Sequence, residues 1–156
     1  MTFYAVVDVF SQTINPVLAL IVLGAPWISR QRLVERRTYY TGALAAVALA
    51  YLWWWGAKSS HQWEQAWGVQ FSTHWAVHLA LLSAFWQLRG RWRVAAIVIA
   101  LGYGALILAR GYHTPADLLW TSAALLPTLA LLWWGIIRGF GPVSRARPPD
   151  STPMRV

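Results

Sequence analysis

Apolar residues fall along this chain in five long stretches, separated by short polar segments. Each stretch is close to the length of about 20 residues that a helix needs to cross the hydrocarbon core of a bilayer. The pattern predicts an all-α integral membrane protein, a bundle of about five transmembrane helices. The expected spans are 9–28, 38–57, 71–88, 94–109 and 116–137.

Basic residues are distributed unevenly between the polar segments. Eleven of the thirteen lie in segments 29–37 and 89–93 and in the tail from Arg138, which alternate along the chain with the segments that hold Lys58 and Arg110. Cytoplasmic segments of membrane proteins carry the excess of arginine and lysine. We therefore expect the N-terminus outside and the C-terminus in the cytoplasm.

The same pattern divides the chain into two parts. Residues 1–138 are expected to form the transmembrane domain, and residues 139–156, rich in proline and arginine, a disordered basic cytoplasmic tail. Tryptophans gather near the predicted span ends, as in the aromatic belts of membrane proteins. The expected location is the plasma (inner) membrane.

Composition narrows the function classes. The net charge of +8 would suggest nucleic acid as the partner of a soluble protein, but here the arginines alternate with apolar stretches, so we expect no nucleic-acid partner. The chain has no cysteine, which excludes disulfides and thiolate chemistry.

Two polar motifs are predicted to share the outer face. In "FSTH", Ser72 or Thr73 can cap the helix that carries His74, and the free N–H groups of a helix N-terminus bind anions. In "HTPAD", His113 and Asp117 are four residues apart, so they share a face if the helix begins near His113. A carboxylate that holds one ring nitrogen leaves the other as a base or nucleophile.

Arg110, just before the second motif, adds a planar guanidinium suited to phosphate oxygens. Together the two motifs describe a phosphoryl-transfer site at a membrane surface. The chain resembles, over roughly residues 38–137, the type 2 phosphatidic acid phosphatase superfamily of membrane lipid phosphatases. "FSTH" is similar to the Pro-Ser-Gly-His motif of that family, and "HTPAD" matches its His-x3-Asp element.

The resemblance implies a metal-independent hydrolase without a cofactor, acting on a phosphorylated membrane lipid. His113 would attack phosphorus and form a phosphohistidine, with Asp117 orienting its ring. His74 would protonate the leaving oxygen and then activate water. Arg110, Ser72 and the backbone near Thr73 would stabilise the developing charge.

Two features depart from the family pattern. The family arginine lies six residues before the second histidine, whereas Arg110 lies three before His113, a spacing that resembles the sphingolipid synthase branch. The family's Lys-x6-Arg-Pro motif is absent, although Lys58, the single lysine, lies on the expected face and is kept as a phosphate-binding candidate.

Two alternatives remain at this stage. The first is a head-group phosphotransferase of the same fold, in which an alcohol replaces water as acceptor. The second is a metal- or haem-binding membrane protein, because His74 and His78 stand at the i, i+4 spacing of a ligand pair and His113 is a third possible ligand. The interpretation of His78 that we favour is a hydrogen-bonded packing residue.

Overall fold

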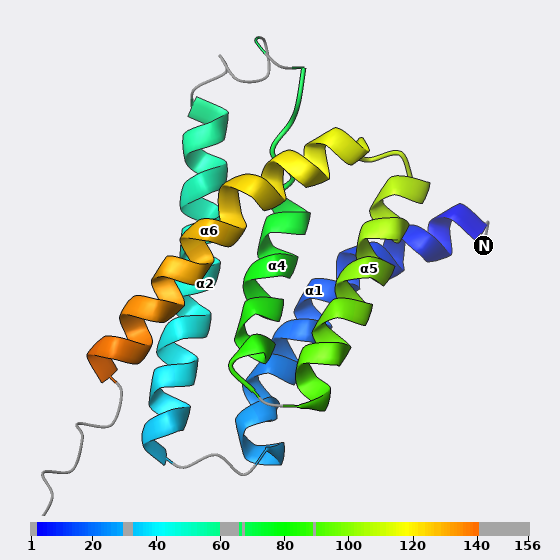
Figure 1. The fold of residues 1–156 in the computed structure, drawn as a ribbon. Helices are drawn as coiled ribbons and strands as arrows, with labels where there is room; N and C mark the ends of the chain where they lie inside the picture. Colours follow the sequence, from blue (N-terminus) through cyan, green and yellow to red (C-terminus); the bar gives the residue numbers. More distant parts are fainter. Residues whose placement is uncertain (1–2, 30–32, 60–65, 67, 89, 141–156) are drawn as a thin grey trace, which may run out of the picture.

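The structure is a computed structural model that describes residues 3–29, 33–59, 66, 68–88 and 90–140. No strand occurs within these ranges. The helices with described bounds are α1 (Phe3–Ile28), α2 (Leu33–Ser59), α4 (Thr73–Trp86), α5 (Arg91–Ala109) and α6 (Pro115–Phe140). Consecutive helices run in opposite directions (Figure 1). The all-α prediction and the five helices are thus confirmed for this part of the chain.

Two helix boundaries differ from the prediction. α4 has 14 residues, because Ser72 caps its start and Gln87 its end, and it is about 21 Å long. α6 continues to Phe140, so residues 139 and 140 belong to the helix and not to the predicted tail. The remainder of that tail, 141–156, lies outside the described residues.

The expectation of five spans is only partly met by helix length and composition. Among the described residues, α5 and α6 are long and apolar enough to cross a membrane, and Thr13–Ile28 forms a shorter apolar segment. α4 is shorter than the about 30 Å of a hydrocarbon core. α2 is less apolar than α5. Its first turns carry charged residues, and further along it has alanines and aromatic residues where α5 has aliphatic side chains.

α4 lies at the centre of the bundle and contacts the four other described helices (Figure 1). Ala76, Ala80 and Ala84 recur at every fourth position of this helix and are fully buried. Such a row of small side chains allows neighbouring helices to approach closely, as at helix interfaces in membranes. The packing therefore fixes α4, and with it the motif at its N-terminus.

α2 and α6 approach each other closely at Gly42. A Cβ atom placed on Gly42 would lie 2.2 Å from the indole ring of Trp133. The ring is held in place, because its Nε1 donates a hydrogen bond of 2.9 Å to Ser83 Oγ of α4. Only glycine fits at position 42 without displacing that ring.

We expect Gly42→Ala to destabilise the fold by about 1–3 kcal/mol through overpacking. The measurement is thermal unfolding of the purified protein in detergent. Gly102→Ala is the matched control, since that helical glycine has open space at the Cβ position. Equal melting temperatures for the two variants would show that the contact with Trp133 does not constrain the helix pair.

Candidate functional site

The first motif forms the N-terminus of α4. Ser72 has extended backbone angles, φ −83° and ψ 103°, and its Oγ accepts a hydrogen bond of 3.3 Å from the Trp75 N–H. This is the N-cap geometry, in which the side chain satisfies one of the N–H groups that a helix leaves unpaired at its start. The predicted capping role of Ser72 is confirmed.

The second motif forms a capping box at the start of α6. The Thr114 N–H donates to Asp117 Oδ2 at 2.8 Å, and the Asp117 N–H donates back to Thr114 Oγ1 at 3.2 Å. Pro115 follows at the first helical position, where its missing N–H leaves no bond unmade. Two reciprocal bonds therefore fix the first turn of α6, with aspartate in the place of the more usual glutamate.

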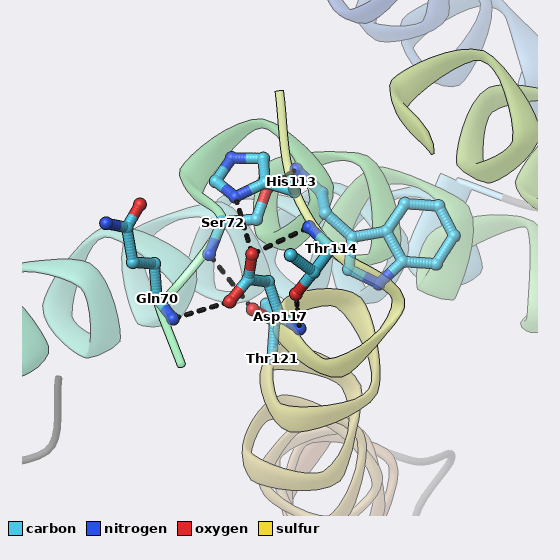
Figure 2. Close-up of polar contacts among 7 residues, drawn as sticks. Gln70, Ser72, His113, Thr114, Asp117 and Thr121 are labelled. Carbon is cyan, nitrogen blue, oxygen red and sulfur yellow. Dashed lines mark hydrogen bonds and ion pairs between the residues drawn. The ribbon is translucent and has the colours of Figure 1, made fainter. Parts of the chain in front are cut away.

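Three hydrogen bonds join the two motifs. The Gln70 N–H donates to Asp117 Oδ1 at 2.6 Å, and the Ser72 N–H donates to Thr121 Oγ1 at 3.0 Å (Figure 2). Trp75 Nε1 donates to Ser122 Oγ at 2.8 Å. We call these six residues the polar clasp. It brings together chain segments that are 47 to 49 residues apart.

His113 lies beside the clasp without a hydrogen bond to it. Its Nδ1 is 3.6 Å from Asp117 Oδ2, within ion-pair distance but beyond hydrogen-bond distance, and accepts or donates no hydrogen bond to the described residues (Figure 2). Both carboxylate oxygens already accept backbone N–H groups, which stabilise the ionised carboxylate. The predicted hydrogen bond between His113 and Asp117 is therefore absent, although the two side chains are adjacent.

The position of the helix start explains this difference. A shared helical face for His113 and Asp117 depended on a helix start near His113, but the helix begins at Pro115, because a proline disfavours helical backbone angles for the residue before it. His113 therefore belongs to the connection between α5 and α6, and the i, i+4 geometry of a helix does not apply. Its side chain remains 18% exposed, so a ligand from outside can reach the ring.

His74 occupies the second position of α4 and is exposed. Its backbone carbonyl accepts a hydrogen bond of 3.1 Å from Asn15 Nδ2 of α1, whereas its ring makes no bond to the described residues. The structure places His74 at the same end of the bundle as His113 without bringing the two rings into contact. Thr73, beside it, is half-buried in the first turn of α4.

The two predicted phosphate-binding cations also lie at this end, each on an aromatic ring. The Arg110 guanidinium donates to the Tyr112 hydroxyl at 3.1 Å and lies 5.2 Å from the centre of that ring. The Lys58 ammonium, in the last turn of α2, lies 5.1 Å from the Trp54 ring.

His78 is a packing residue. It is fully buried, its Nδ1 lies 2.8 Å from Asn15 Oδ1, and its ring lies against Trp75 and Tyr103. Among the described residues no group of three or more His, Cys, Asp or Glu side chains is arranged to hold a metal ion. The part of the chain that the structure describes therefore gives the metal or haem alternative no support.

Sequence reasoning missed several residues of this region. Gln70, Thr121 and Ser122 of the clasp were not singled out, and Asn15 was not recognised as the link from α1 to α4. A signal existed for three of them: polar side chains within apolar helices generally find hydrogen-bond partners on neighbouring helices. Gln70 contributes only its backbone N–H, so its residue type carries no such signal.

The electrostatics of this end favour an anion. The N-termini of α4 and α6 meet at the clasp, and each carries the positive end of a helix dipole. Asp117 compensates the dipole of α6, whereas the first turn of α4 has no acidic residue. The side chains of Lys58 and Arg110 add two positive charges at the same end of the bundle.

Comparisons of the chain with protein-family models, with curated proteins and with solved structures find no match. The assignment of a function therefore depends on the fold and on the clasp.

Proposed function

We propose that this chain is a multi-pass membrane phosphatase that hydrolyses a lipid phosphate or diphosphate at the extracytoplasmic face through a phosphohistidine. One observation carries the proposal. The polar clasp joins the N-termini of α4 and α6, so that the capped start of α4 and the reachable ring of His113 occupy one place. An anion-binding helix N-terminus beside a partly exposed histidine ring is the minimum that phosphoryl transfer to histidine requires.

The outer surface supports a location in the membrane. On α5 the aliphatic side chains of Val98 and Leu101 are 62% and 70% exposed, although this helix is among the most apolar of the chain. The core helix of a soluble protein would bury these side chains. Trp27 and Trp134 each lie under an arginine guanidinium, 3.9 and 4.0 Å from its carbon, as expected of interfacial anchors.

The chemistry follows from the positions of the side chains. The Nε2 of His113 would attack phosphorus while Nδ1 faces Asp117, and the bond from phosphorus to the lipid oxygen would break. His74 would give that oxygen a proton, and would then take one from the water that cleaves the phosphohistidine. The 3.6 Å separation between His113 and Asp117 would shorten when a positive charge develops on the ring, since such bonds commonly tighten on substrate binding.

The test is phosphate release by the purified protein from a panel of lipid phosphates and diphosphates. We expect activity that survives EDTA and is blocked by vanadate, which imitates pentacoordinate phosphorus. Transfer of the phosphoryl group to an added alcohol, in preference to water, would replace the hydrolase by the phosphotransferase. Loss of activity on chelation, with stoichiometric zinc or iron in the protein, would contradict the proposal.

Orientation in the membrane gives a separate prediction. Arg36, Arg91 and Arg138 lie at the end of the bundle opposite the clasp, so the clasp should face away from the cytoplasm (Figure 1). The chain has no cysteine, so single cysteines report without background. Ala116→Cys should react with an impermeant maleimide added to intact cells, and Gly139→Cys should react only after lysis. The reverse pattern would contradict this topology.

A further inference from the structure

The clasp borders an apolar groove between α2 and α6. Its walls are formed by three sets of residues: Leu49, Leu52, Trp53, Gly56 and Ala57 of α2, Val69 and Phe71 before α4, and Trp120, Ala123 and Ala124 of α6. The α2 residues recur at three- and four-residue intervals and therefore share one face of the helix. Glycine and alanines on both walls leave the space open, which amounts to about 520 Å³.

The groove has a fixed wall. The rings of Trp53 and Phe71 are stacked, 6.5 Å between centres and 15° between planes. Trp53 Nε1 donates a hydrogen bond of 3.2 Å to Thr128 Oγ1, which ties this wall to α6. The groove is therefore preformed, as most small-molecule sites are, and its volume lies within the range of about 300–1,000 Å³ of such sites.

One end of the groove meets the polar clasp. Phe71 directly precedes Ser72, and Trp120 directly precedes Thr121, whose hydroxyl accepts the Ser72 N–H. On the α2 wall, the lining residue Ala57 is followed by the exposed Lys58. Apolar lining thus continues into a region with a positive helix end and a cation, which is the complement of an anionic amphiphile.

We propose that this groove binds the hydrocarbon chain of a single anionic lipid, whose head then lies at the clasp. A transmembrane helix of about 10 Å diameter would fill 520 Å³ with little more than one turn, so a hydrocarbon chain fits and a partner helix does not. The inference rests on the proposed function only for the phosphate in the lipid head. Binding of the hydrocarbon chain in the groove does not require turnover.

The variant that tests this is Gly56→Leu. A Cβ atom at Gly56 meets nothing within 4 Å, so the leucine side chain enters the groove without displacing backbone. Gly102→Leu is the matched control, because Gly102 is also helical, exposed and open, but lies on α5 outside the groove. A common effect of both substitutions on folding is thus separated from the effect of filling the groove.

The experiment uses the full chain in nanodiscs of zwitterionic phosphatidylcholine. The probe is a dodecyl phosphate with a diazirine in its chain, and the cross-linked residues are mapped by mass spectrometry. We expect cross-links at groove residues of α2 and α6, with labelling of Gly56→Leu at least about tenfold weaker, since displacing two methylene groups accounts for that factor. Gly102→Leu should be labelled like the unmodified chain.

A competition experiment distinguishes recognition of the head group from recognition of the hydrocarbon chain. Unlabelled dodecyl phosphate should compete better than dodecanol, and inorganic phosphate should not compete. Equal labelling of the two glycine variants, or cross-links confined to the lipid-facing side of α5, would overturn the proposal. A dimer that Gly56→Leu abolishes would assign the groove to a second copy and also overturn it. Groove labelling without any phosphatase activity would leave this inference standing and remove the proposed function.

Discussion

Replacing His113 with alanine should remove phosphate release from every lipid phosphate, a loss on the order of 10⁴-fold or more, together with any acid-labile phosphoenzyme. The ring is the nucleophile in the proposed reaction, and the covalent intermediate forms on it. Its Nδ1 makes no hydrogen bond in the structure. The substitution should therefore leave the melting temperature close to that of the unmodified chain.

His74→Ala is the comparison that separates the two histidines. If His74 is the acid, this variant should be slow on lipid phosphates, whose leaving oxygen needs a proton, and near normal on p-nitrophenyl phosphate, whose leaving group does not. Because the ring is exposed and unbonded, stability should again be unchanged. Retention of a phosphoenzyme by His113→Ala, with equal losses of both substrates in His74→Ala, would reverse the roles.

Asp117→Asn should lower turnover on the order of 10²- to 10⁴-fold, as for other carboxylates that orient a histidine. The same substitution should destabilise the fold, because the aspartate oxygens accept the N–H groups of Gln70 and Thr114 and an amide offers only one oxygen. Hydrogen bonds to a charged group contribute about 1.5–3 kcal/mol each. The measurements are turnover at saturating substrate and thermal unfolding in detergent.

Thr121→Val is the control for the structural part of this effect. It leaves the buried Ser72 N–H without its acceptor, at a cost of about 1–3 kcal/mol, but does not touch His113 or Asp117. We expect Thr121→Val to lower the melting temperature while the folded protein keeps most of its turnover. Equal loss of turnover in the two variants at matched stability would show that Asp117 acts only as a clasp residue.

The hydrogen bonds of Asp117 explain how one carboxylate can both hold the clasp together and orient His113. Its carboxylate completes the capping box of α6 and holds the segment before α4. Each carboxylate oxygen accepts one hydrogen bond in these two roles. Each carboxylate oxygen has a second lone pair. Asp117 Oδ2, 3.6 Å from His113 Nδ1, can therefore accept a further hydrogen bond when the ring becomes charged.

The sequence by itself determined the local features of this protein. For the described residues, the all-α class, the five helices with their order, and the capping role of Ser72 follow from apolar stretches and N-terminal residue types, which act within a few residues. It also determined that both motifs lie at one end, since antiparallel connections place the starts of α4 and α6 together. The predicted start of the last span, residue 116, lies one residue from the observed start at Pro115, so the condition that would have put His113 on the helix is not met.

Only the tertiary structure decided which side chains meet. That Asp117 is bonded to Gln70 and Thr114, and that Asn15 pairs with His78, depends on how far each helix is rotated about its axis. The rotation is set by packing, such as the approach of Trp133 to Gly42, and no periodicity in the sequence contains it. The apolar groove beside the clasp has the same origin, because small residues create space only where two particular helix faces are opposed.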